Sequence, residues 1–91
     1  MPSTAAPVPT GSVTVRYWAA ARAAAGVDRE ELAVGNDPTV GEVLEATLHR
    51  HPDLVAVLRV ASFLVDGRAA RRIDPVSPGS VVEVLPPFAG G

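Results

Sequence analysis

The chain contains no cysteine and no lysine. Without cysteine it has no disulfide, no thiol nucleophile, no cysteine zinc site and no iron–sulfur cluster. Because all 8 basic residues are arginine, the N-terminus carries the only amine. No stretch approaches the roughly 18 apolar residues that a transmembrane helix requires, and the first residues lack the basic start of a signal peptide. We therefore expect a cytoplasmic protein with no membrane partner.

The chain also has little net charge. Its formal charge is −2 and it has no arginine-rich run, which argues against nucleic acid as a partner. With 91 residues, of which 47% are hydrophobic, the chain is long enough for one globular domain but not for two. Residues 1–12 contain 3 prolines and no periodic pattern, so they predict a flexible N-terminal tail. The folded domain is expected over residues 13–87.

The hydropathy pattern predicts strands and helices in the order β-α-β-α-β-β-β. A short alanine-rich helix is expected at residues 19–25, where Gly26 closes it. The pair Asp66-Gly67 predicts a tight hairpin, and residues 77–80 predict a type II turn. Strands are expected at residues 13–18, 29–34, 62–65, 69–73 and 80–85.

The clearest helix is expected over residues 40–50. Thr39 and Glu42 have the spacing of a capping box, and Pro52 ends the segment. The apolar positions follow a helical period, so one face should be buried, including Leu44 and Leu48. Together the elements predict an α+β fold, a mixed sheet of four to five strands with one main helix packed on one face. Parallel pairing of the first and last strands would make it a β-grasp roll.

The expected domain shows no active site of its own. His49 and His51 are two positions apart and point in different directions on a helix, so both are interpreted as surface residues. The acidic pair Glu30-Glu31 has no ligand set beside it and is interpreted as charge on an edge strand. We expect no metal site and no bound cofactor.

The C-terminus carries the strongest functional signal. Its last residues are Pro86, Pro87, Phe88, Ala89, Gly90 and Gly91. The two prolines favour an extended exit, which would project residues 88–91 from the domain as a reactive tail. Glycines without side chains can enter a narrow channel, where the terminal carboxylate of Gly91 is open to attack. A carboxylate must first be activated, as in adenylation by ATP, so the chemistry would lie in a partner.

In these features the chain resembles the MoaD/ThiS sulfur carriers, which share the β-grasp fold with ubiquitin. The resemblance covers residues 13–91 and rests on the motifs VTVRYWAAARAAAG, PTVGEVLEATL, VDG, PGSVVEVLPP and PPFAGG. The Pro-Pro-x-x-Gly-Gly ending is most similar to the small subunit of molybdopterin synthase. The first helix departs from the family pattern, since Arg22-Ala23-Ala24 stands in place of Arg-Glu-Leu.

The resemblance implies a non-catalytic, ubiquitin-like sulfur carrier. A ubiquitin-activating-like enzyme would use ATP to adenylate the carboxylate of Gly91, and a sulfur donor would convert it to a thiocarboxylate. The tail would then insert into the large subunit of molybdopterin synthase, which transfers the sulfur during molybdenum cofactor biosynthesis. Gly90 and Gly91 would be the functional residues, and Phe88 and Ala89 would line the inserted tail.

The strand pattern adds a candidate docking surface. The alternation predicts a set of residues on the first and last strands that faces the helix: Val13, Val15, Tyr17, Val82 and Val84. In that case Trp18, Leu85 and Leu64 face outward. A solvent-facing tryptophan beside the tail is typical of a binding hot spot, and in related carriers this sheet face meets the partner. The alternative is that Trp18 packs beneath residues 53–60.

Three other functions fit the same sequence. The thiocarboxylate could serve another pathway, such as thiamine thiazole, cysteine or thio-sugar synthesis. The chain could instead modify other proteins through Gly91, although without lysine it would form no lysine-linked chains on itself. In the third case the chain is an interaction module whose tail has no function.

Overall fold

The structure is a computed structural model in which residues 11–87 are described. The expected N-terminal tail lies outside these residues except for Gly11 and Ser12, and the expected reactive tail, residues 88–91, lies outside them entirely. The elements along the chain are β1 (Gly11–Tyr17), α1 (Ala20–Ala25), β2 (Arg29–Val34), α2 (Val40–Arg50), η1 (Pro52–Leu54), α3 (Val55–Val60), β3 (Ser62–Val65), β4 (Arg68–Ala70) and β5 (Val81–Leu85).

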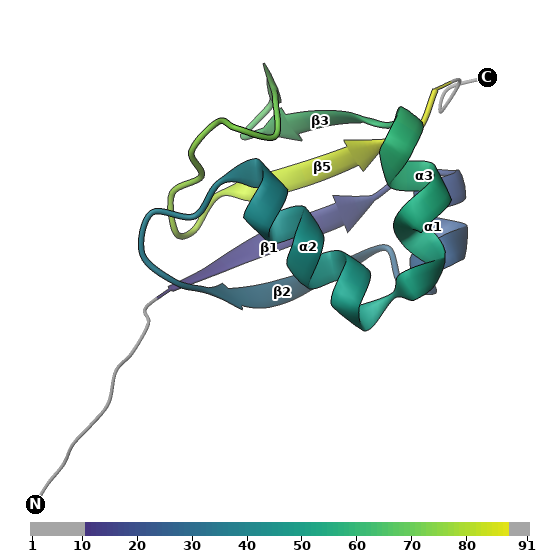
Figure 1. Ribbon diagram of the computed structural model, residues 1–91, viewed down its shortest axis with the longest axis horizontal. Coiled ribbons are helices and arrows are strands. Elements are labelled where there is room, and N and C mark those ends of the chain that lie inside the picture. Colours follow the sequence, from purple (N-terminus) through teal and green to yellow (C-terminus); the bar gives the residue numbers. More distant parts are fainter. Residues whose placement is uncertain (1–10, 88–91) are drawn as a thin grey trace, which may run out of the picture.

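The five strands form one mixed sheet in the order β2-β1-β5-β3-β4. The first and last strands, β1 and β5, are neighbours at its centre and run parallel, whereas all other neighbouring pairs are antiparallel. Helices α2 and α3 cover one face, and α1 lies beside α3 at the end of the sheet (Figure 1). The predicted α+β class, mixed β-grasp sheet and main helix are therefore confirmed. Within residues 11–87, no helix has the length and apolar character needed to cross a membrane.

Strand β1 begins earlier than predicted. Gly11 and Ser12 pair with β2, so the strand starts two residues before the expected Val13. The position requires glycine, because a Cβ on Gly11 would lie 2.5 Å from the Cβ of Pro78. The first residue of the sheet is therefore packed against the turn that precedes β5.

Strand β4 is shorter than the predicted strand over residues 69–73, since it ends at Ala70. The chain turns there: the Arg71 N–H donates to Asp74 Oδ2 at 2.8 Å, and the Asp74 N–H donates to the Arg71 carbonyl at 3.0 Å. The next carbonyl, that of Arg72, accepts a hydrogen bond from the N–H of Gly41 in the first turn of α2. This segment therefore binds the start of α2 instead of extending the sheet.

The core lies between the sheet and the helices. Its side chains from β1 and β5 are Val13, Val15, Tyr17, Val82 and Val84, and from α2 they are Val40, Val43, Leu44 and Thr47. Leu44 is buried as predicted, but the prediction was wrong for Leu48, which is only partly buried. Leu48 lies at the margin of the apolar face and lines a groove between α2 and α3.

The local signals at turns and helix ends are confirmed. Thr39 and Glu42 form the predicted capping box, in which each backbone N–H donates to the other side chain. Asp66 and the glycine after it have φ of 50° and 84°, as a tight two-residue hairpin requires. Hydrogen bonds from the Val81 N–H and the Ser80 hydroxyl hold the pKa of the Asp66 carboxyl below its usual range.

Candidate functional site

The face of the sheet opposite α2 and α3 carries the residues expected to bind a partner. Along β5, the buried Val82 and Val84 alternate with the half-buried Glu83 and Leu85. Because successive side chains of a strand point to opposite sides, Glu83 and Leu85 lie on the outer face of the sheet. Among residues 11–87, α2 and α3 both lie on the other side of the sheet, so neither helix covers this outer face (Figure 1).

Trp18 extends the outer face beyond the end of β1. Its backbone N–H donates to the carbonyl of Val84 at 3.2 Å, which holds it beside β5. The Arg16 guanidinium carbon lies 4.6 Å from the centroid of the Trp18 ring, within cation–π range. Arg16 also lies opposite Glu83 in the parallel pair, with 3.9 Å between Arg16 Nη1 and Glu83 Oε2. Arg16 therefore connects the indole of Trp18 to β5.

This geometry favours the outward interpretation of Trp18 over packing beneath residues 53–60. Trp18 is 38% exposed, and the guanidinium that stacks on it belongs to the outer face. Leu64 lies directly opposite Glu83 on β3, so it shares this face and is half-buried. Trp18, Leu64 and Leu85 form an apolar surface around the Arg16–Glu83 pair, which we call the Trp18 patch.

The Trp18 patch lies where the chain leaves the sheet. Strand β5 ends at Leu85, Pro86 is buried and Pro87 is exposed. Proline has no N–H to donate, so strand pairing cannot continue beyond Leu85. Phe88, Ala89, Gly90 and Gly91, which the sequence assigns to the reactive tail, lie outside the described residues.

A polar cluster that the sequence did not predict lies on the inner side of the sheet, around Glu30. One Glu30 oxygen accepts a hydrogen bond from the Tyr17 hydroxyl and lies 2.8 Å from His51 Nε2. The other oxygen lies 3.3 Å from Arg50 Nε. Burial of Tyr17, followed by its hydrogen bond to Glu30, raises the pKa of the Tyr17 hydroxyl far above its ordinary value.

This inner cluster joins β1, β2 and the end of α2 through the side chain of Glu30. Tyr17 is only 2% exposed, and residues 11–87 contain no group of three or more possible ligands for a metal ion. The surface interpretation was wrong for His51, whose side chain is 19% exposed, whereas His49 is exposed as predicted. β2 is an edge strand, as predicted for Glu30, but the Glu30 side chain faces inward and is 12% exposed. The one available signal was that an inward-facing tyrosine needs a partner for its hydroxyl.

A mixed β-grasp sheet with parallel terminal strands at its centre, and an open face beside the C-terminal exit, defines the ubiquitin-like class of small carrier and modifier proteins. The ThiS family matches residues 15–91, which is most of the chain, and the chain belongs to this family. Members of the family are small sulfur carriers without catalytic activity, and the chain is accordingly not an enzyme.

Individual relatives fall into two groups. The chain is 27% identical over 81 residues to the molybdopterin synthase sulfur carrier subunit of Chlamydomonas reinhardtii, covering 87% of this chain and 98% of that protein. The crystal structure of SAMP1, the small archaeal modifier protein 1 of Haloferax volcanii, matches with a TM-score of 0.80 and 28% identity over 89% of this chain and 100% of that one. A complex of subunits 1 and 2 of the molybdopterin-converting factor from Helicobacter pylori matches with a TM-score of 0.63 and 25% identity, covering 88% of this chain and 99% of that one. The chain is therefore similar both to sulfur carriers and to a small modifier.

Proposed function

We propose that the chain is the sulfur carrier subunit of molybdopterin synthase. The C. reinhardtii relative carries this name, and the H. pylori neighbour is a complex of two molybdopterin-converting factor subunits. The single observation that carries the proposal is the Trp18 patch, an apolar surface beside the exit of a chain that ends in Gly90-Gly91. This combination gives a partner both a surface to bind and a terminus to process.

The proposed chemistry takes place at the Gly91 carboxylate. One of its oxygens attacks the α-phosphorus of ATP, which is bound by a ubiquitin-activating-like enzyme, and pyrophosphate leaves. Hydrosulfide from a sulfur donor then attacks the carbonyl carbon of the acyl adenylate and expels AMP, which leaves a thiocarboxylate. When the sulfur passes to the pterin precursor, an oxygen from water restores the carboxylate. The carrier itself holds no cofactor in this cycle.

The two parts of the site have different roles in the proposal. Trp18 and Leu85 bind the large subunit of the synthase through their exposed apolar surface, and Trp is enriched among residues that dominate such interfaces. Phe88 and Ala89 line the inserted tail, and Gly90 allows the last peptide to pass through a channel too narrow for a side chain. Docking therefore brings the Gly91 carbonyl to the catalytic groups of the partner.

Sulfur loading of Gly91 tests the proposal directly. The chain is incubated with ATP, its adenylating enzyme and a sulfur source, and intact mass spectrometry detects the replacement of one oxygen by sulfur. We expect loading of the natural chain and none of a variant with one residue added after Gly91. The added residue displaces the reacting carbonyl, and a displacement of about 1 Å can already reduce a rate roughly 100-fold.

The substitution Gly91→Ala is the matched control, because it adds a methyl group but keeps the carboxylate at the same position. We expect it to load sulfur more slowly than the natural chain and faster than the extended variant. If the extended variant loads sulfur while its mass proves that no protease has trimmed it, the terminal carboxylate is not the reactive group.

Reconstitution separates the molybdopterin pathway from the others. The loaded chain is mixed with the large synthase subunit and the pterin precursor, and we expect molybdopterin to form as the thiocarboxylate disappears. Loading without molybdopterin formation would keep the sulfur carrier function and reject this pathway in favour of thiazole, cysteine or thio-sugar synthesis.

The similarity to SAMP1 favours a second candidate, in which Gly91 is joined to amines of other proteins. Without lysine the chain offers no side-chain amine to a second copy, so lysine-linked chains of copies could not form on a target. Denaturing gels of cell lysate, probed with an antibody against the chain, would then show a ladder of conjugates that disappears in the extended variant. A single band at the position of the free chain would reject this candidate.

A further inference from the structure

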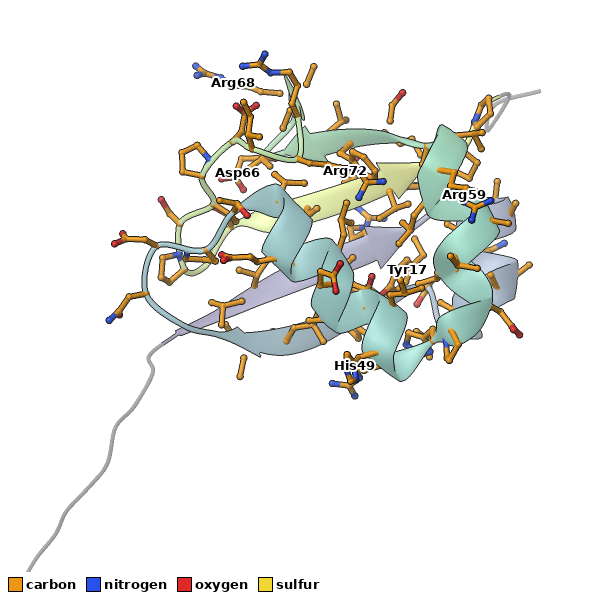
Figure 2. The ribbon with its side chains drawn as sticks, viewed as in Figure 1. Tyr17, His49, Arg59, Asp66, Arg68 and Arg72 are labelled. Atoms are coloured by element: carbon orange, nitrogen blue, oxygen red, sulfur yellow. The ribbon has the colours of Figure 1, made fainter. Side chains whose placement is uncertain are left out.

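The helical layer contains a groove that the proposed function does not use. Two adjoining hollows, of about 180 Å³ and 280 Å³, lie between α2 and the η1–α3 segment, and both are lined by Glu45 and Leu48. Arg72 lies at one end of this region and His49 at the other (Figure 2). We call the two hollows together the α2–α3 groove.

The α2–α3 groove has an apolar floor. Leu44 and Leu58 are 1% and 5% exposed and close the bottom of the groove. Leu48 is only partly buried, and Val55, on the opposite wall, is 46% exposed. The apolar face of α2 is thus wider than the part that contacts the sheet, and Leu48 and Val55 remain partly exposed. A partner that covered them would gain about 25 cal/mol of binding free energy per Å² of apolar surface buried.

One end of the groove is positively charged. Arg59 and Arg72 both line it, and neither takes part in any of the ion pairs found within residues 11–87. Arg72 is held in place, since its Nη2 donates to the Leu58 carbonyl at 2.8 Å and its guanidinium lies 5.2 Å from the Phe63 ring. A fixed guanidinium beside an apolar floor is suited to bind a segment in which an acidic residue stands next to an apolar residue.

We propose that the α2–α3 groove binds a segment of a partner protein that carries a large apolar side chain next to an aspartate or glutamate. The apolar side chain covers Leu48 and Val55, and the carboxylate pairs with Arg59 and Arg72. Glu45, where the two hollows meet, repels an acidic group from the middle of the groove and so fixes the direction of the segment. The mode of binding is that of a short amphipathic segment in an apolar groove.

The position of the groove gives it a role distinct from that of the Trp18 patch. The groove lies between helices α2 and α3, which cover one face of the sheet (Figure 1), whereas the residues of the Trp18 patch belong to the opposite face. A protein bound in the groove therefore leaves Trp18, on the opposite face, free. The carrier can then contact one protein through the groove and another through the Trp18 patch.

Selection from random peptides on phage, with the full chain as bait, tests this proposal without knowledge of the natural partner. We expect enriched peptides to contain Leu or Phe within a turn of Asp or Glu. The best peptide is synthesised and titrated into the isotope-labelled full chain. We expect NMR shifts for the amides of Leu48, Val55 and Arg59, and none for the Trp18 indole.

Matched variants then assign the contacts. Arg59→Glu should weaken peptide binding at least tenfold, whereas Arg68→Glu should leave it unchanged, because Arg68 belongs to the β3–β4 hairpin away from α3 (Figure 2). Val55→Ser should weaken binding, and Ile73→Ser, which also changes an exposed apolar residue, should not. Circular dichroism of each variant confirms that the fold is retained.

Three outcomes overturn the proposal. One is the absence of any enriched acidic–apolar peptide, and another is a set of shifts centred on Trp18 in place of the groove. The third is that the same groove amides shift when the chain alone is concentrated, which would mean that a second copy of the chain occupies the groove.

Discussion

Tyr17 and Trp18 are adjacent aromatic residues in opposite environments. Tyr17 is 2% exposed and hydrogen-bonded to Glu30, whereas Trp18 is 38% exposed and stacked against Arg16. Tyr17 is the last residue of β1, and the alternation of the strand continues to Trp18, which places the two side chains on opposite faces of the sheet. The inner side chains contribute to stability, and the outer ones form a surface that a partner can bind. Substitutions on the inner face should therefore lower the free energy of unfolding, and substitutions on the outer face should lower the affinity for the partner.

The largest effect is expected in the inner core. Leu44→Ala should lower the free energy of unfolding by about 2–5 kcal/mol, because Leu44 is almost fully buried and the substitution leaves a cavity. Leu48→Ala should cost clearly less, since Leu48 is partly open to the α2–α3 groove. Urea denaturation of both variants measures the difference. Equal losses would mean that Leu48 belongs to the core after all.

Trp18→Ala should weaken partner binding and leave the free energy of unfolding almost unchanged. We expect the affinity for the proposed partner, the large synthase subunit, to fall at least 30-fold, which corresponds to about 2 kcal/mol and is typical of a tryptophan hot spot. The free energy of unfolding should change by less than about 0.5 kcal/mol, as for other surface substitutions. Titration calorimetry and urea denaturation measure the two quantities. A large loss of stability without loss of affinity would place Trp18 in the core.

Glu30→Gln and Glu31→Gln form a matched pair on β2. Glu30 binds Tyr17, His51 and Arg50, so replacing its charge should cost about 1–3 kcal/mol of unfolding free energy. Glu31 is exposed, and its substitution should cost less than about 0.5 kcal/mol. Neither variant should change affinity for the large subunit. If both variants lose the same unfolding free energy, the contacts of Glu30 contribute nothing beyond the loss of one negative charge.

Ionisation of the Tyr17 hydroxyl should change the free energy of unfolding least near neutral pH and clearly in alkali. Its pKa is raised in the folded chain, so its contribution to stability is complete below the ordinary tyrosine value of about 10 and is lost as the pH rises above it. The unfolding free energy should then fall by about 1.4 kcal/mol per pH unit. The chain has one tyrosine, no lysine and no cysteine, so Tyr17→Phe should remove this slope. If the unfolding free energies of the natural chain and the variant change with pH in parallel, the pKa of Tyr17 is not raised.

The sequence predicts those features whose causes are local. Thr39 and Glu42 are three residues apart, and the Asp66 turn is set by one glycine, so short-range geometry determines both. Alternation within β1 and β5 likewise predicts which valines are buried. The predicted strand over residues 13–18 is one residue too long at its end, since β1 ends at Tyr17, but the same alternation continued to Trp18 predicts its outward position.

The features that the sequence does not reveal depend on contacts between distant segments. Glu30 and His51 are 21 residues apart, and only the packing of α2 on β2 brings their side chains together. The pairing of Arg16 with Glu83 depends on the register of two parallel strands, for which no turn provides a signal. The extent of burial on α2 depends on where α3 lies, so the partial exposure of Leu48 could not be predicted from helical periodicity.

The parallel pairing of β1 and β5 has a mechanical consequence. Tension between the N-terminal end of β1 and the C-terminal end of β5 acts along both strands and tries to slide one past the other. The backbone hydrogen bonds from Thr14 to Ser80 and from Trp18 to Val84, with those between them, are then loaded together and must break together. The hairpin of β3 and β4, pulled at its open end, would break one bond at a time. We therefore expect force spectroscopy to find this small domain resistant to traction on its C-terminal tail, in the direction in which a partner would draw it.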